Sequence, residues 1–262
     1  MKVWAIANQK GGVGKTTTAV SLGGILSQRG IRTLLVDADP HGSLTSYFRY
    51  SPDDLESSVY SLFENRRLDP LSVIQPTRFD NLQILPASMA LATLDRQLST
   101  QSGMGLVLQQ VLQKLAPHYD CALIDCPPML GVLMVNALAA CDHLVIPVQT
   151  EFLALKGLER MLRTLTMVVR SRNLTLPYTI VPTMFDRRTR ASADALRLLR
   201  KQYGPEVLWR FVIPVDTQFR DASRVGTPLP LHATQARGVM AYQKLLKSLL
   251  AEQRDAQRAA VI

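Results

Sequence analysis

Short apolar runs alternate with amphipathic stretches along most of this chain. Several of the runs are almost continuously apolar, which is typical of β-strands that are covered on both faces of a sheet. The runs that we expect to form strands are Val3–Ala7, Thr33–Val36, Leu82–Leu85, Cys121–Ile124, His143–Val148, Tyr178–Val181 and Val207–Ile213.

Helices are expected between these strands, because apolar residues there recur at helical spacing. Lys15–Gln28 carries an apolar stripe on one face, and residues 152–169 keep alternating spacings of three and four. Ser192 is expected to cap a helix that ends near Tyr203. A further stripe over residues 239–249 predicts a C-terminal helix.

This alternation of strands and helices predicts an α/β fold, with a doubly wound, mostly parallel sheet and helices on both faces. We expect a single domain over residues 1–262, with a flexible tail after about residue 250. The stretch Ser43–Arg78 has polar turns and only short apolar clusters. We therefore expect loops and short helices there, inside the same domain.

The net charge of the chain indicates which kind of binding partner to expect. No window of the 262 residues is long and apolar enough for a membrane span, so none is expected. The net charge of +9 and the pI near 9.7 favour polyanions, nucleic acid before anionic lipid. The chain has an odd number of cysteines, namely Cys121, Cys126 and Cys141, and none of them has CxxC spacing. We therefore expect reduced, inert thiols.

Residues 9–17 read Gln-Lys-Gly-Gly-Val-Gly-Lys-Thr-Thr, between an expected strand and an expected helix. This context predicts a phosphate-binding loop. The three glycines let backbone N–H groups turn toward phosphate oxygens, and the helix that starts near Lys15 adds the positive end of its dipole. We expect Lys15 to reach the β- and γ-phosphates, Thr16 to hold Mg²⁺ and Thr17 to contact the α-phosphate.

The stretch from Lys10 to Thr17 resembles the deviant Walker A motif of the ParA/MinD family of ATPases, and the resemblance continues to about Leu250. It implies ATP and Mg²⁺ as cofactors. In that family the early lysine, here Lys10, crosses a dimer interface to the partner's phosphates, where a cation neutralises charge as the phosphoryl group leaves. The resemblance implies catalytic roles for Lys10 and Lys15, and ATP binding by Gly11, Gly12, Val13, Gly14, Lys15, Thr16 and Thr17.

Two of the expected strands end in acids that resemble the family's other Walker motifs. The resemblance implies that Asp39 orients the attacking water and that Asp125 holds Mg²⁺ through a water. It also implies that Asp37 acts on Mg²⁺ indirectly, by contacting the groups that are bound to the metal. The spacing of two puts Asp37 and Asp39 on one side if the strand continues. His41 stands where the family often has glutamine; it tunes hydrolysis, contacts a partner or is tolerated drift.

Three further segments resemble parts of the family that contact the adenine or the dimer partner. Met184 lies in the loop Thr183–Thr189, and Pro214 and Asp216 follow the last apolar run. The resemblance places all three residues near the adenine. Pro147–Glu151 and the helix start after it resemble the strand and helix that face the partner in a homodimer.

Arginines in the last third of the chain resemble residues with which the family contacts DNA. Arg188 matches a family DNA arginine by position, whereas Gln218 stands where a second arginine is common. Arg220 and Arg224 are close enough in sequence to replace that arginine if they share its face. A solvated surface position is the alternative for each of them. Binding of this kind is independent of DNA sequence, since phosphate contacts suffice.

The resemblance implies an ATPase that dimerises with ATP, binds non-specific DNA, and positions or segregates a cargo. The cargo is a chromosome or plasmid, or a protein cluster such as a chemotaxis array. A ParB-like or cargo-adaptor partner would stimulate slow hydrolysis, in the cytoplasm, on the nucleoid or at a pole.

Other functions remain open at this point: a MinD-like ATPase on the membrane, or a regulator of flagellar placement or number. The tail after Leu250 lacks the bulky apolar face of an interfacial helix, which disfavours membrane binding. A redox ATPase with a bridging iron–sulfur cluster would need interface cysteines, and Cys126 and Cys141 do not match that pattern.

Overall fold

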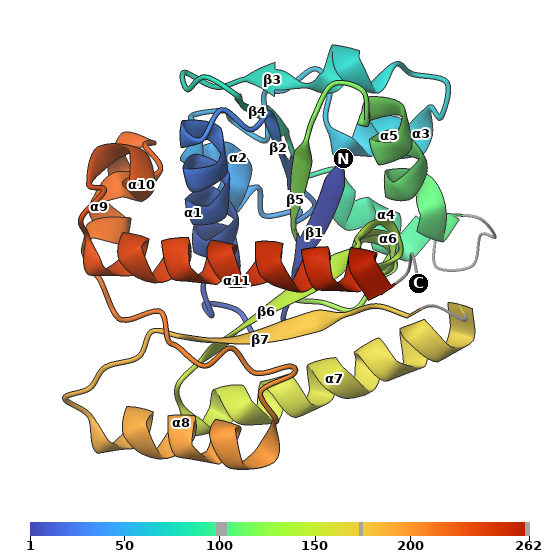
Figure 1. Ribbon diagram of the computed structural model, residues 1–262. Helices are drawn as coiled ribbons and strands as arrows, with labels where there is room; N and C mark the ends of the chain where they lie inside the picture. Colours follow the sequence, from blue (N-terminus) through green and yellow to red (C-terminus); the bar gives the residue numbers. More distant parts are fainter. Residues whose placement is uncertain (98–103, 173–174, 260–262) are drawn as a thin grey trace.

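A seven-stranded sheet forms the centre of the computed structural model, which describes residues 1–97, 104–172 and 175–259 (Figure 1). The strand order is β3-β4-β2-β5-β1-β6-β7, and every neighbouring pair is parallel except β3 with β4. The strands are β1 (Lys2–Ile6), β2 (Thr33–Asp37), β3 (Gln75–Pro76), β4 (Leu82–Leu85), β5 (Cys121–Asp125), β6 (His143–Gln149) and β7 (Tyr178–Thr183).

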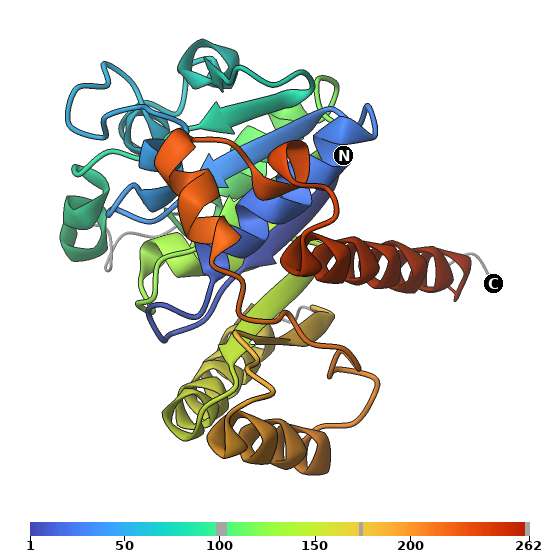
Figure 2. The same ribbon diagram turned by 90° about the vertical axis from the view of Figure 1, so that its left-hand side faces the viewer.

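Helices cover both faces of the sheet, and α7 and α8 lie beside β6 and β7 (Figures 1 and 2). The α-helices are α1 (Lys15–Gln28), α2 (Ser43–Tyr47), α3 (Val59–Glu64), α4 (Leu91–Gln97), α5 (Val107–Leu115), α6 (Val132–Ala140), α7 (Phe152–Arg172), α8 (Arg190–Gln202), α9 (Gln218–Val225), α10 (Leu229–His232) and α11 (Arg237–Ala259). Two 3₁₀ turns, η1 (Pro70–Val73) and η2 (Met104–Leu106), complete the elements of the described part.

Alternation along β1 shows how the two layers arise. Trp4 and Ile6 pack in one buried cluster with apolar residues of α1 and α11. Val3 and Ala5 face the other way, into a cluster that includes residues of α5, α6 and α7. Successive side chains of a strand point to opposite faces, so one short run supplies both cores. The predicted α/β fold, with its mostly parallel sheet, is therefore confirmed.

Most of the expected elements are present with small shifts at their ends. The helix predicted over Lys15–Gln28 has those bounds, and so does the strand over Leu82–Leu85. The stretch Ser43–Arg78 contains short helices, as expected, but also β3, an edge strand that the sequence pattern did not indicate. Two residues are too few to show a period. Helix α11 continues to Ala259, and the flexibility expected after about residue 250 stays a prediction.

The strand expected over Val207–Ile213 is wrong. Only isolated bridges join this part of the chain to the sheet, at Leu208 with Ile180 and at Pro214 with Phe185. Trp209 N–H donates to the Ile180 carbonyl oxygen over 2.9 Å, but the next ladder bond would need an N–H on residue 182. Because Pro182 has no N–H, the ladder ends there.

The cap predicted at Ser192 is also wrong. Helix α8 begins two residues earlier, at Arg190, with Thr189 as its N-cap residue. Ser192 is buried, and its Oγ lies 2.6 Å from Thr150 Oγ1 and accepts a hydrogen bond from Asp186 N–H over 3.1 Å. Its hydroxyl joins the ends of β6 and β7 instead of capping the helix.

No described helix is both long enough and apolar enough to cross a bilayer. In Figure 2, α11 runs outward from the sheet, and its buried residues, which include Tyr242 and Leu249, pack on the cluster around α1.

A buried histidine begins β6. His143 Nε2 lies 2.8 Å from Thr179 Oγ1 on the neighbouring β7. Burial lowers the pKa of His143 from 6.5 to about 4, because the charged imidazolium is poorly solvated there. The unfolded chain therefore takes up this proton at a higher pH than the folded protein does.

We predict that His143 makes the protein acid-sensitive between pH 6.5 and 4. Its contribution to stability is complete above the unfolded pKa and is lost as the pH falls toward the folded pKa, a change of about 3 kcal/mol. Urea unfolding at several pH values should show a shallower decline for His143→Gln than for wild type. His118→Gln, at an exposed histidine, is the control and should keep the wild-type slope. Equal slopes for wild type and His143→Gln would contradict the prediction.

Candidate functional site

The predicted phosphate loop connects the end of β1 to the start of α1. Gly12 and Gly14 have φ angles of +72° and +92°, in the left-handed region that glycine adopts without strain. Gly14 is the N-cap residue of α1, and no side chain caps the helix there. A Cβ at Gly11 or Gly12 would meet no heavy atom within 4 Å. The first amides of α1 are thus available to an anion.

Lys15 is almost completely buried at the first position of α1. Its side chain reaches back into the loop, where Nζ donates a hydrogen bond to the Lys10 carbonyl oxygen over 3.3 Å. A buried ammonium is poorly compensated by one carbonyl and calls for negative partners. The position of Lys15 therefore suits phosphate oxygens.

Asp125 ends β5 and is buried beside the start of α1. Its Oδ2 accepts a hydrogen bond from Thr16 Oγ1 over 2.6 Å, whereas Oδ1 has no hydrogen-bond partner among the described residues. Burial, and the negative charge of Asp37 nearby, raise the pKa of Asp125 well above its ordinary value. A buried polar atom without a partner requires an explanation, and a cation beside Thr16 and Asp125 supplies one.

The donor set around Asp125 fits Mg²⁺ in particular. Mg²⁺ is held in proteins by one or two carboxylates, a hydroxyl and phosphate oxygens, and it keeps several waters. Within the described ranges, no group of three His, Cys, Asp or Glu side chains is placed to enclose a metal ion. The two predicted ligands Thr16 and Asp125 are in contact with each other, as an open magnesium site needs.

Asp37 is fully buried at the end of β2, in register with Asp125 on the neighbouring β5. Its Oδ2 accepts hydrogen bonds from Thr45 N–H and Thr45 Oγ1, each over 2.7 Å, and its Oδ1 accepts one from Asp39 N–H over 3.2 Å. Burial raises the pKa of Asp37 to about 7. These bonds tie Asp37 to the loop after β2, and its predicted action on Mg²⁺ stays a prediction.

The strand does not continue from Asp37 to Asp39. Because the Asp37 carboxylate accepts the Asp39 N–H, the chain turns out of the sheet at this point. Asp39 Oδ1 in turn accepts the His41 N–H over 3.0 Å and lies 2.9 Å from His41 Nδ1. His41 is therefore in contact with the proposed water-orienting acid, which its place in the sequence alone could not show.

Lys10 forms an ion pair within its own chain. Its Nζ contacts Glu151 Oε1, just before α7 begins. Sequence reasoning placed Glu151 in a segment that faces the dimer partner but did not assign it to Lys10, since the two residues are far apart in the chain. To reach across an interface, Lys10 must first leave Glu151.

Exposed apolar side chains flank the phosphate loop. Met129 follows β5 and is 70% exposed, and Phe152 and Leu153 begin α7 and are 64% and 69% exposed. Since β1 lies between β5 and β6, these side chains stand on either side of the loop at the carboxyl edge of the sheet. Large apolar groups left in solvent are typical of an interface.

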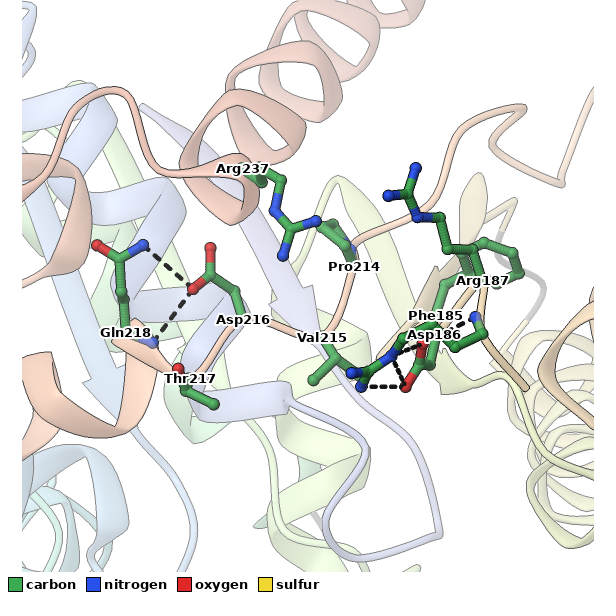
Figure 3. A pocket seen from close by; sticks show the side chains of 10 residues that line it. Phe185, Asp186, Arg187, Pro214, Val215, Asp216, Thr217, Gln218 and Arg237 are labelled. Atoms are coloured by element: carbon green, nitrogen blue, oxygen red, sulfur yellow. Dashed lines mark hydrogen bonds and ion pairs between the residues drawn. The ribbon is translucent and has the colours of Figure 1, made fainter.

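A pocket of about 530 Å³ lies beyond the loop, between β7 and the start of α11 (Figure 3). Pro214 and Asp216, both predicted to be near the adenine, line it, and Arg237 reaches in from α11. Asp216 accepts hydrogen bonds from Gln218 N–H and Gly238 N–H, each over 3.1 Å, so its carboxylate also joins α9 to α11. Arg237 carried no sequence signal for this position.

Met184, the third predicted base contact, has a positive φ of 52°, which is unusual outside glycine. A Cβ at Gly14 would stand 3.9 Å from Met184 Cε, so the methionine side chain lies over the phosphate loop. Met184 precedes Phe185, which lines the pocket, and a contact of Met184 with the adenine stays a prediction. Backbone strain of this kind is often found at binding sites.

The predicted DNA-contacting arginines lie on two elements. Arg188 follows β7; its side chain is 80% exposed and forms a two-pronged ion pair with Asp186 at 2.8–3.3 Å. Arg220 and Arg224 are exposed and stand one turn apart on α9. Their surface positions permit a role in DNA binding and do not require it.

Comparison with known proteins agrees with this geometry. Residues 1–177 match the model of a family described as an AAA domain. The chain is 38% identical over 251 residues to the sporulation initiation inhibitor protein Soj of Bacillus subtilis, across 95% of this chain and 98% of that protein. The chain belongs to the ParA family of P-loop ATPases. It is also 35% identical to the chromosome partitioning protein ParA of Caulobacter vibrioides, across 99% and 98% of the two chains.

A solved structure resembles this ParA-family chain along nearly its whole length. It is the crystal structure of cobyrinic acid a,c-diamide synthase from Mycobacterium smegmatis, with a bound ATP analogue and magnesium. The TM-score is 0.84 at 34% identity, over 98% of this chain and 97% of that one. The family resemblance stated from the Walker motifs is confirmed.

We predict that Thr45→Val destabilises this ParA-family protein by about 2 kcal/mol, because it removes the hydroxyl that donates to Asp37 and accepts from Ala87 N–H. Valine keeps the shape of the side chain, so the loss reports on the hydrogen bonds. Urea unfolding at pH 8 measures the change. Thr166→Val, at an exposed threonine of α7, is the matched control and should stay within about 0.5 kcal/mol of wild type. Equal effects of the two substitutions would contradict the role given to Thr45.

Proposed function

We propose that this chain is an ATP-driven positional switch. It binds ATP with Mg²⁺, closes face to face with a second copy, gains affinity for non-specific DNA, and is released when a ParB-like or cargo-adaptor partner stimulates hydrolysis. The two relatives described as chromosome partitioning or sporulation control proteins support this proposal. The ATP analogue and magnesium in the M. smegmatis structure agree with the expected cofactors.

One observation carries the proposal: the corner formed by Lys15, Thr16 and Asp125. A buried ammonium reaches into the glycine loop, where it bonds one carbonyl oxygen, and Asp125 nearby has a buried carboxylate oxygen without a hydrogen-bond partner among the described residues. Each of these groups is costly to bury alone. A triphosphate and a divalent cation together would satisfy all of them, and no apolar ligand would.

The residues of this corner divide the chemical work. Lys15 and the loop amides hold the phosphates and stabilise the charge that develops on them. Thr16 and Asp125 would hold Mg²⁺, which supplies further positive charge to the phosphate oxygens when it is bound. Asp39 orients the attacking water, and its contact with His41 sets the direction of its carboxylate. The adenine would lie by Pro214.

The second copy is needed to complete the site. Lys10 is half-buried in the loop after β1, and Met129 and Phe152 follow the strands on either side of β1, so a face-to-face partner would cover all three. In the dimer we propose that Lys10 leaves Glu151 and contacts the partner's phosphates. Burial of the apolar side chains would offset the loss of the ion pair.

Charge is unevenly distributed along the chain, which supports a polyanionic partner. After residue 150 there are 19 Lys and Arg against 9 Asp and Glu; before it there are 11 against 12. The positively charged part after residue 150 contains α7, α8, α9 and α11, together with Arg188, Arg220 and Arg224. Contacts to DNA phosphates would be salt-dependent and independent of sequence.

We predict that Lys10→Ala keeps the affinity for ATP within about twofold of wild type but lowers turnover about a hundredfold, since a cation supplied in trans acts on the leaving phosphoryl group. Nucleotide titration and steady-state turnover over a range of protein concentrations measure the two effects. Lys114→Ala removes an exposed lysine in the last turn of α5, outside the proposed interface, and should behave like wild type. Unchanged turnover in Lys10→Ala would rule out the trans role.

We predict that ATP increases the affinity for unrelated DNA duplexes at least tenfold over ADP or no nucleotide, and that this affinity falls steeply with salt. Filter binding or fluorescence anisotropy across a salt series measures both. Arg220→Gln and Arg224→Gln should each lower the salt slope by about one. Arg67→Gln, at an exposed arginine of the first half, is the control. If ATP adds no affinity, DNA is not the surface on which this protein works.

A further inference from the structure

We propose that Tyr47 and Arg49 are positioning residues that transmit the state of the nucleotide corner to α9, the helix that carries Arg220 and Arg224. This inference rests on the proposed function in one respect, that the corner takes nucleotide. It assigns the coupling to two particular side chains, which the family resemblance does not do.

The first link runs from the corner to α2. The Asp37 carboxylate, in register with Asp125, accepts two hydrogen bonds from Thr45 in the middle of α2. Thr45 Oγ1 also accepts the Ala87 N–H over 2.9 Å, so the helix is fixed to the end of β4 as well. A change in charge around Asp125 and Asp37 therefore acts directly on α2.

The second link joins the end of α2 to the end of α9. Tyr47 Oη donates a hydrogen bond to the Thr227 carbonyl oxygen over 2.8 Å, and Arg49 Nη2 donates to the Arg224 carbonyl oxygen. The last carbonyls of a helix lack partners within the helix and carry partial negative charge. Arg49 supplies both a donor and a positive charge to the C-terminal end of α9.

Two residues at this junction have positive φ angles, and only one of them is a glycine. Arg49 has a φ of 71° at the end of α2, a position where glycine is the common choice. Across from it, Gly226 ends α9 with a φ of 66°, and a Cβ there would stand 2.9 Å from the Tyr47 carbonyl oxygen. The two helix ends are in contact, and Arg49 keeps its side chain at a cost in backbone strain.

Helix α9 depends on its ends because little holds its middle. Ala222 is its only fully buried residue. A pocket of about 270 Å³ lies under it, lined by Thr17 of α1, Ser43 of α2 and Arg220. At the other end, Phe219 packs on the Tyr242 ring, whose Oη lies 2.9 Å from Thr18 Oγ1 of α1. An element with so few buried contacts is displaced easily when an end contact changes.

Arg78 offers a matched comparison within the same junction. Its Nη2 donates to the Val225 carbonyl oxygen over 2.8 Å and to Thr227 Oγ1. It approaches the same end of α9 from the loop before β4, not from α2. Loss of Arg78 would loosen α9 in every nucleotide state, whereas loss of Tyr47 Oη and Arg49 would uncouple α9 from the corner.

Hydrogen exchange of residues 218–227, with Mg²⁺ and either ADP or a non-hydrolysable ATP analogue, tests the coupling. In wild type the two nucleotides should give different exchange rates. In Tyr47→Phe/Arg49→Gln this difference should shrink about fivefold or more, the effect of a hydrogen bond lost from one state only. Arg78→Gln should raise exchange in both states and keep the difference. Tyr50→Phe removes a hydroxyl that donates to the Pro76 carbonyl oxygen, away from α9, and should match wild type.

The outcomes separate this inference from the proposed function. If the double variant keeps the wild-type difference in exchange, the coupling through Tyr47 and Arg49 is wrong. If coupling is seen but ATP adds no affinity for DNA to wild type, the inference stands and the DNA proposal fails. When both hold, the ratio of DNA affinities with ATP and with ADP should fall about fivefold in the double variant.

Discussion

The burial of unlike charges at one corner of the sheet governs the rest of this structure. Lys15, Asp37 and Asp125 are all removed from water at the carboxyl ends of β1, β2 and β5. Only Asp37 has its oxygens satisfied by hydrogen bonds from the protein, through Thr45 and Asp39. The other two groups are stabilised fully only with a ligand that carries charge of both signs. Binding of nucleotide and metal would therefore offset the free-energy cost of burying these charges.

The burial of Asp37 explains why the loop after β2 is bonded to its carboxylate. A carboxylate held by backbone N–H groups is sensitive to any cation placed near it, and Asp37 holds both α2 and the turn that presents Asp39. Through α2 the same constraint reaches the end of α9. In the dimer proposed above, the ion pair of Lys10 with Glu151 would respond to the other event, the arrival of a second subunit. On this proposal, nucleotide and the second subunit act on separate contacts.

The sequence predicts what depends on local spacing and misses what depends on contacts across the sheet. The glycine loop, α1 and the strand-end acids follow from residue types in a row. The extent of the segment after Val207 depends on Pro182, which belongs to a neighbouring strand and breaks a ladder that only the fold defines. Ser192 reads as a cap because its partner Thr150 is forty-two positions away in the chain. Glu151 and Arg237 were missed for the same reason.

The light packing of α9 has a consequence for divergence within the family. Because Ala222 alone is fully buried there, the outward residues of this helix can be exchanged without opening a cavity in the core. Gln218, which stands where the family resemblance implies an arginine, lies on this surface with Arg220 and Arg224. Substitutions on this surface can thus change what α9 contacts while the nucleotide corner stays the same, so similarity of the corner says little about the surface of α9.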